Sequence, residues 1–130
     1  MIIAVDFDGT IVEHRYPEIG APVPQALEML LELQNNGHEI ILWTMRSGER
    51  LQEAVAYLAR HGIRLWGINH NPQQGDWTSS PKAYAQMYID DAAIGCPLVY
   101  PEEGRPYVDW PRLRSEIAVK WGTSVLSPLA

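Results

Sequence analysis

Two hydrophobic periodicities alternate along this chain, and their alternation constrains the fold more than any other feature. Short, continuous apolar runs rich in β-branched residues are typical of strands buried on both faces. Such runs occur at residues 2–7, 39–44, 64–68, 87–89 and 96–100. Segments with helical spacing or a helix-starting proline lie at residues 24–36, 49–61, 81–86 and 111–120. This order predicts an α/β fold with a doubly wound parallel sheet.

The length and charge of the chain limit its domain count and its partners. At 130 residues, the length predicts a single domain, residues 1–130, without a separate substrate-binding domain. The net charge is −6, and no run of lysines and arginines provides the basic face that nonspecific nucleic-acid binders carry. Nucleic acid is therefore expected only as a substrate.

The composition also indicates a compartment. Cys96 is the only cysteine, so no intrachain disulfide can form, and we interpret it as a small buried residue. Acidic residues interrupt the first apolar run, which does not resemble a signal peptide, and no apolar segment has the length of a membrane span. These features predict a cytoplasmic protein without a membrane partner.

Polar residues follow three of the predicted strands at the point where each strand ends. They are Asp6 and Asp8, then Thr44, then Asp90 and Asp91. In an open parallel sheet, ligands bind at the carboxyl ends of the strands. The sequence therefore predicts a site at this edge of the sheet.

The residue types at this edge favour a magnesium ion and phosphate chemistry. Carboxylates brought close together repel each other and need a cation or a proton, and oxygen ligands suit Mg²⁺, which also binds substrate phosphate. The scattered histidines and the lone cysteine do not suggest zinc. One aspartate can attack phosphorus as a nucleophile, and a second can donate and accept the proton.

Four short segments resemble the motifs of the haloacid dehalogenase (HAD) superfamily. The first is VDFDGT, residues 5–10, which resembles the DxDGT motif after a hydrophobic strand. Thr44 at the end of IILWT resembles the second motif, Lys82 the third, and Asp90-Asp91 in MYIDD the acidic fourth. The four motifs occur in the order of the family and span residues 5–91.

The resemblance implies roles for these residues. It implies Asp6 as the nucleophile, Asp8 as the acid and base, and Thr44 and Lys82 as phosphate-binding residues. It also implies that Mg²⁺ is held by Asp6, the main-chain carbonyl of Asp8, and Asp90 or Asp91. The implied fold is a Rossmann-like sheet of order 5-4-1-2-3.

Other residues beside the motifs have weaker assignments. Arg46 is a candidate for substrate binding, and a surface salt bridge is an equal alternative. His14 and Arg15, in the loop after the first strand, are weaker candidates for substrate contact. Thr44 and Lys82 could also be an ordinary strand-end residue and a solvated lysine.

The spacing of the motifs leaves no room for a cap domain. Residues 11–43 and 45–81 already contain the expected helices and strands, so the chain resembles the capless subgroup, whose open sites act on large substrates or are covered by a neighbouring subunit. A homo-oligomer is therefore possible. Trp77, in the loop of residues 69–80, is predicted to lie near the mouth of the site.

Two functions fit these observations. The first is a magnesium-dependent phosphatase that acts on a sugar phosphate, a nucleotide or the end of a polynucleotide. The alternative is a non-catalytic module that binds phosphate or metal on the same fold. The Asp6/Asp8 pair favours the phosphatase.

Overall fold

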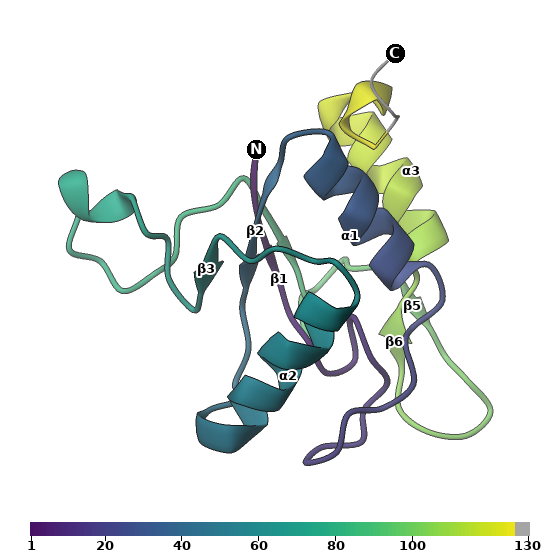
Figure 1. Cartoon of the computed structure of the whole chain (residues 1–130). Coiled ribbons are helices and arrows are strands. Elements are labelled where there is room, and N and C mark those ends of the chain that lie inside the picture. The colour runs from purple at the N-terminus through teal and green to yellow at the C-terminus, as the bar shows by residue number, and fades with distance from the viewer. Residues whose placement is uncertain (127–130) are drawn as a thin grey trace.

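The architecture is α/β, with a parallel sheet of four strands. A computed structural model describes residues 1–126 (Figure 1). The strands lie in the order β3-β2-β1-β4. Their bounds are β1 (Ile2–Val5), β2 (Glu39–Leu42), β3 (Gly67–Ile68) and β4 (Met87–Ile89). This arrangement is consistent with a Rossmann-like fold. The central strand β1 is flanked by β2 on one side and by β4 on the other.

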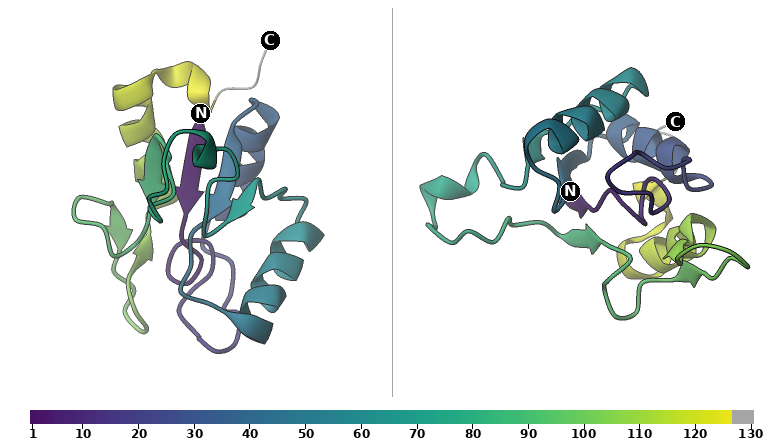
Figure 2. Two further views of the ribbon diagram at one scale, coloured as in Figure 1. Left: turned by 90° about the vertical axis from the view of Figure 1, so that its left-hand side faces the viewer. Right: turned by 90° about the horizontal axis from the view of Figure 1, so that it is seen from below.

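Three α-helices lie on one side of this sheet (Figure 2). They are α1 (Ala26–Asn35), α2 (Gly48–Arg60) and α3 (Trp110–Trp121). Because side chains alternate along a strand, Ile3 and Val5 of β1 point to this side and join the main core with the buried leucines of α1. Trp110, at the start of α3, is completely buried in the same core. None of the helices in residues 1–126 combines the length and apolar composition needed to cross a bilayer.

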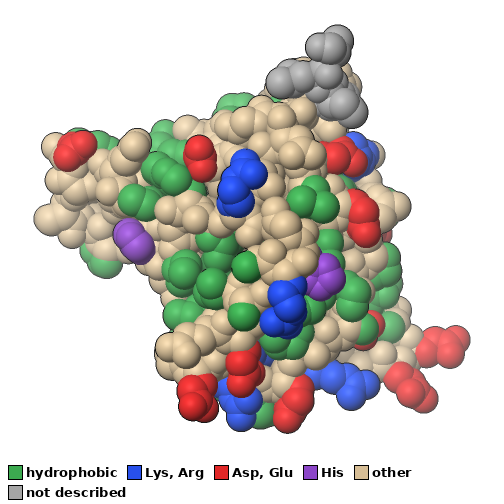
Figure 3. Space-filling view, in the orientation of Figure 1, with side chains coloured by type: hydrophobic (Ala, Val, Ile, Leu, Met, Phe, Trp, Pro, Cys, Tyr) green, Lys and Arg blue, Asp and Glu red, His purple; other side chains and the backbone are tan. Residues whose placement is uncertain are grey.

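The opposite face of the sheet is covered without an α-helix. A small second core there contains Ala4, Ile41 and Ala85, with Trp43 and Trp66 packed against it. The connection from β3 to β4 runs over this face and projects as a long arm, residues 69–86, with a short 3₁₀ helix, η1 (Gln74–Asp76), near its tip (Figures 1 and 2). The arm also stands out from the body of the molecule in the space-filling view (Figure 3). The crossing itself is what a doubly wound sheet requires when the strand order reverses.

The prediction of a short helix at residues 81–86 is wrong. The side chain of Gln74 holds the returning limb of the arm in an extended form. Its Nε2 donates hydrogen bonds to the carbonyl oxygens of Ser80 and Lys82, and its Oε1 accepts one from the Tyr84 N–H, at 2.9, 2.8 and 2.7 Å. These backbone groups are therefore not available for helical hydrogen bonds.

The expected fifth strand does not join the four-stranded sheet. β5 (Leu98–Val99) pairs antiparallel with β6 (Tyr107–Val108) in a separate hairpin. The expected order 5-4-1-2-3 is therefore observed only as 4-1-2-3. Cys96, just before β5, is half-buried, and burial raises the pKa of its thiol, which agrees with its interpretation as a packing residue.

Candidate active site

The ends of β1 and β4 are adjacent, and they bring Asp6 and Asp90 together. The chain leaves β1 toward the helical side of the sheet and reaches β4 from the other side, so the strand order reverses between these two strands. The crevice at such a point is where open α/β sheets bind ligands. Strand pairing extends one residue further, because the Asp6 N–H donates to the Ile89 carbonyl at 2.9 Å. The position of the Asp6 main chain is thus fixed by the sheet.

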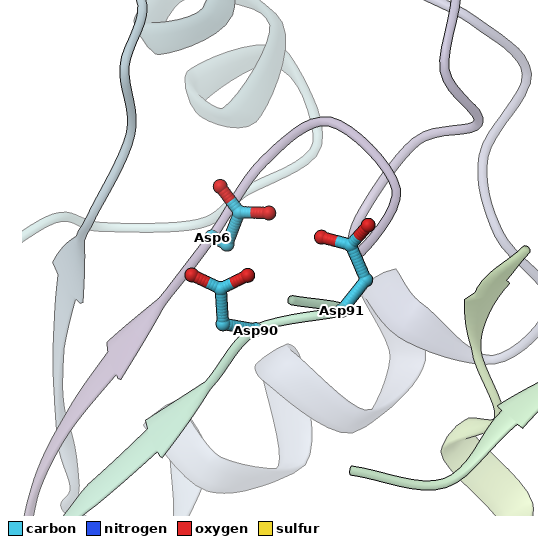
Figure 4. A group of neighbouring side chains, drawn as sticks. All are labelled: Asp6, Asp90 and Asp91. Atoms are coloured by element: carbon cyan, nitrogen blue, oxygen red, sulfur yellow. The ribbon is translucent and has the colours of Figure 1, made fainter. Parts of the chain in front are cut away.

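Asp6, Asp90 and Asp91 form one cluster of carboxylates (Figure 4). Each contributes an oxygen atom, and these atoms all lie within 4.8 Å of one another. Burial, followed by interaction with Asp91 and Asp90, raises the pKa of Asp6 to about 8. Burial also raises the pKa of Asp90. At neutral pH, Asp6 in this cluster therefore retains a proton that an isolated aspartate would lose.

Thr10 and His14 organise this cluster. The buried Thr10 hydroxyl lies 3.1 Å from Asp6 Oδ2, to which it donates, and it accepts a hydrogen bond from the Asp91 N–H at 3.2 Å. His14 Nε2 lies 2.9 Å from Asp91 Oδ2. Burial alone would raise the pKa of Asp91, but its interactions with Asp6 and His14 outweigh burial and lower it.

A glycine is required where the chain turns between the strand and His14. Gly9 has φ +83°, and a Cβ atom there would lie 2.0 Å from His14 Nε2 and 2.6 Å from Asp91 Oδ2. The predicted motif therefore contains two residues whose roles the sequence reasoning did not assign. Thr10 follows Asp6 by four residues, and Gly9 makes the turn that brings its hydroxyl back to the carboxylate.

Asp8 points to a different partner from Asp6. Arg46 forms two hydrogen bonds with its carboxylate, Nε to Oδ2 and Nη2 to Oδ1, each 2.8 Å long. The Arg46 guanidinium also donates to the carbonyl oxygens of Pro17 and Glu18, at 3.2 and 2.8 Å. The hydrogen bond to Asp8 raises the pKa of Arg46.

These contacts bear on both interpretations of Arg46, as a substrate-binding residue and as part of a surface salt bridge. Arg46 is only 2% exposed, so its ion pair with Asp8 is not a surface salt bridge. Its guanidinium donates to Asp8 and to the carbonyl oxygens of Pro17 and Glu18, so a substrate would have to compete with these partners. Substrate binding by Arg46 stays a prediction. The pair joins the end of β1 to the segment after β2.

Thr44 lies where the sequence predicts, at the end of the β2 segment. Its N–H donates to Asn69 Oδ1 at 2.7 Å, and its Oγ1 accepts from the Arg46 N–H at 3.1 Å. Because Oγ1 acts as the acceptor in that bond, its own hydrogen can be donated to a ligand. Asn69 has φ +57°, an uncommon backbone conformation for a residue other than glycine.

Two cavities meet at Asp6, Thr44, Met45 and Asp90. The smaller, of about 340 Å³, is completed by Trp43 and Asn69. The larger, of about 480 Å³, extends past the cluster toward the hairpin and is also lined by Asp8, His14, Tyr16, Arg46, Asp91, Ala92 and Arg105. Asp6, Asp8, Thr44, Asp90 and Asp91 are thus brought together, as the sequence predicts.

Lys82 and Trp77 are not brought to this place. Both lie in the arm on the helix-free side of the sheet, and neither lines either of the two cavities. Lys82 Nζ lies 5.6 Å from the centroid of the Tyr88 ring. Trp77 is 65% exposed and packs edge-to-face on Tyr84. The structure therefore does not support the prediction that Trp77 lies at the mouth of the site.

The donor set fits a hard divalent cation. Among residues 1–126, no lysine or arginine forms an ion pair with Asp6 or Asp90, so the protein leaves their charges without a cationic partner. Mg²⁺ prefers such oxygen ligands and retains waters for a substrate phosphate to replace. The side chain of Asp8 lies outside the cluster, which leaves its main-chain carbonyl as the group that could contribute.

Comparisons with known proteins give one match of high similarity. A conserved protein coded by a locus of Bacteroides thetaiotaomicron is 40% identical in sequence, with a TM-score of 0.72. The match covers 92% of this chain and 89% of that protein's chain. No protein-family model matches the chain, and no curated protein gives a significant match. The chain therefore belongs to the same family as this conserved Bacteroides thetaiotaomicron protein.

Proposed function

We propose that the protein is a magnesium-dependent phosphate monoester hydrolase of the capless HAD type. The observation that carries this proposal is the cluster of Asp6, Asp90 and Asp91, which lies at the reversal of the strand order. Within the described residues 1–126, no lysine or arginine pairs with Asp6 or Asp90. The DxDGT-like segment of residues 5–10 supports it. Mg²⁺ held by this cluster would neutralise the carboxylates and the negative charge of the phosphoryl group.

In the first step, an oxygen of the Asp6 carboxylate attacks phosphorus. The new bond from Asp6 to phosphorus forms as the bond from phosphorus to the leaving oxygen breaks, and the leaving oxygen takes a proton from Asp8. Thr10 orients the attacking group through its hydrogen bond to Asp6 Oδ2. The Thr44 hydroxyl, which lines both cavities, donates to a phosphoryl oxygen.

In the second step, water replaces Asp6 on phosphorus. Asp8, now deprotonated, takes a proton from the water as its oxygen attacks, and inorganic phosphate and free Asp6 are released. Asp8 lines the same cavity as Asp6. To act as the acid, Asp8 takes up a proton from solvent, and one of its oxygens separates from Arg46 so that it can meet the leaving oxygen and, in the second step, the water. Binding of substrate must drive this rearrangement.

The cavities suggest how a substrate lies. The smaller cavity, with Trp43, Met45 and Asn69, lies on the side of Thr44, and Met45 is almost fully exposed at its rim. The site is therefore open, which suits a sugar phosphate, a nucleotide or the end of a polynucleotide. In this proposal the protein is cytoplasmic, and a large substrate or a second subunit covers the site.

One observation favours a second candidate function. Arg46 holds both oxygens of Asp8, and a carboxylate fixed in this way is a poor proton donor. A module that binds phosphate or metal without hydrolysing would not need Asp8 to be released. This alternative predicts Mg²⁺-dependent binding of inorganic phosphate without turnover.

Hydrolysis of a simple aryl phosphate separates the two functions. The phosphatase is expected to release phosphate with Mg²⁺, to lose activity after exhaustive EDTA treatment, and to regain it when Mg²⁺ is restored. Asp6→Asn serves as the control for contaminating phosphatases. A panel of phosphorylated metabolites and of oligonucleotides with phosphorylated ends would then identify the substrate class. Wild-type protein that shows no more turnover than Asp6→Asn on any of them would contradict the proposal.

A further inference from the structure

A phosphate-binding cation is missing from the place where the sequence predicts it. Charge builds up on the oxygens of a phosphoryl group during transfer, and cationic side chains usually stabilise it. Lys82 was expected to do so, but it lies in the arm beside Tyr88. Arg46 is held by Asp8. Lys82 therefore lines neither of the two cavities at Asp6, and the Arg46 guanidinium is engaged by Asp8.

Arg105 is a different cation that lines the larger cavity together with Asp6, Asp90 and Asp91. It lies in the connection between β5 and β6, directly after Gly104, which turns the chain with φ +89°. Within residues 1–126 it has no ion pair or hydrogen bond, although Glu103 is close in sequence. Its guanidinium is therefore available to a ligand.

The hairpin that carries Arg105 is fixed to the loop that carries the nucleophile. The Val108 N–H donates to the Gly9 carbonyl at 3.0 Å. The indole Nε1 of the buried Trp110 donates to the Thr10 carbonyl at 2.8 Å. These bonds attach the end of the hairpin to residues 9 and 10, so Arg105 and the cluster belong to one connected unit. The departure of β5 from the main sheet thus has a consequence for the site.

We propose that Arg105 binds the phosphoryl oxygens of the substrate, in the role that the resemblance gives to Lys82. This inference rests on the proposed phosphatase function. A guanidinium suits the role because its planar set of donors matches two phosphate oxygens at once. Arg105 approaches from the hairpin, while Thr44 approaches from the end of the β2 segment.

Two alanine variants test the proposal directly against the resemblance. A hydrogen bond to a charged group is worth about 1.5–3 kcal/mol, so Arg105→Ala should lower kcat/KM for an aryl phosphate about 10- to 100-fold. It should weaken inhibition by inorganic phosphate by a similar factor. Lys82→Ala should change both quantities by less than about threefold. Arg112→Ala, an exposed arginine on α3, is the matched control.

Two further measurements separate contact with phosphate from an indirect effect. Arg105→Lys should recover part of the loss, and added guanidinium should partly restore Arg105→Ala but not Arg112→Ala. The melting temperature of Arg105→Ala should equal that of the wild type, because the side chain is exposed.

The proposal would be overturned if Lys82→Ala lost phosphate binding while Arg105→Ala kept it. Lys82 would then reach the site by a movement of the arm or from a second copy of the chain. Calorimetric binding of inorganic phosphate in the presence of Mg²⁺ needs no turnover. It therefore tests Arg105 even if the wild type hydrolyses nothing, so that failure of this inference and failure of the proposed function remain distinguishable.

Discussion

Asp6 and Asp8, two aspartates at the end of β1, have different electrostatic partners. Asp8 has its countercharge built in, because the buried Arg46 holds both of its oxygens. Asp6, two residues earlier, lies in a cluster with two more carboxylates and accepts a hydrogen bond from the Thr10 hydroxyl. Burying a charge without a partner is costly. The difference is consistent with the proposal that a bound cation supplies the countercharge of Asp6 and Asp90, whereas Arg46 supplies that of Asp8.

The largest expected effect comes from removing Asp6, the proposed nucleophile. Asp6→Asn should lower turnover on the order of 10⁴-fold or more, since losing a nucleophile removes the covalent route. The amide has nearly the shape of the carboxylate and removes one negative charge, so the metal-free variant should be at least as stable as the wild type. Steady-state hydrolysis and thermal unfolding measure the two effects. A variant that retains more than a few per cent of the activity would remove Asp6 from the mechanism.

Asp8→Asn should lower turnover by less than Asp6→Asn does, on the order of 10²- to 10⁴-fold, which is the usual contribution of general acid–base catalysis. With an activated aryl phosphate, the leaving group needs little protonation, so the first step should suffer less than the second. Rapid-quench measurement of the two steps gives the comparison. Equal impairment of both steps would indicate that Asp8 serves mainly to pair with Arg46.

Removing Arg46 should damage the fold rather than the chemistry alone. Arg46→Ala leaves Asp8 without its partner and frees the carbonyls of Pro17 and Glu18. Breaking a buried pair from one side costs about 3–5 kcal/mol, which urea unfolding would measure. Arg50→Ala breaks an exposed ion pair with Glu53 and should cost less than about 1 kcal/mol. Equal losses of unfolding free energy in the two variants would show that the buried Arg46–Asp8 pair stabilises the fold no more than an exposed ion pair does.

The smallest effect expected is the response of stability to Mg²⁺ and pH. The pKa of Asp6 is raised to about 8 in the metal-free fold, so its contribution to stability is greatest below about pH 4 and is lost as the pH rises through about 8. In the proposed mechanism, Mg²⁺ binds the deprotonated cluster and should therefore offset that loss. At a hundredfold excess over its Kd, it should stabilise the protein by about 2.7 kcal/mol.

Thermal unfolding with and without Mg²⁺, at about pH 6 and about pH 9, would measure this coupling. The increase in Tm should be larger at the higher pH and should nearly vanish in Asp6→Asn. An increase that is the same at both pH values would mean that Asp6 does not take part in binding the ion.

The positions of Asp6, Thr44 and Asp90 could be predicted because they depend on a general rule. Parallel strands end at one edge of a sheet, and the sequence marks each end by a change from apolar to polar residues. The partner of Asp8 could not be predicted in the same way. Arg46 follows another strand, and whether it would turn to Asp8 or to a substrate depends on the loop of residues 13–20, whose carbonyls complete its hydrogen bonding.

Lys82 and Arg105 show where local patterns stop being informative. Pro81 favours the first turn of a helix, but hydrogen bonds from Gln74 keep the following residues extended. The apolar run of residues 96–100 predicts the strand that contains β5, but β6 has only two residues, too few for a periodicity to be recognised. β5 pairs with β6 and not with the main sheet. The position of Lys82 away from the cluster and that of Arg105 beside it therefore both depend on contacts between residues distant in the sequence.

The chemistry proposed for the cluster is attack of Asp6 on phosphorus in the presence of Mg²⁺. The most direct test is mass spectrometry of acid-quenched Asp8→Asn protein that has been mixed with an aryl phosphate. Because the second step is slowed, the peptide that contains Asp6 should carry a phosphoryl group when Mg²⁺ is present and none after EDTA treatment. Turnover without phosphorylation of Asp6, or a phosphoryl group on another residue, would contradict the account.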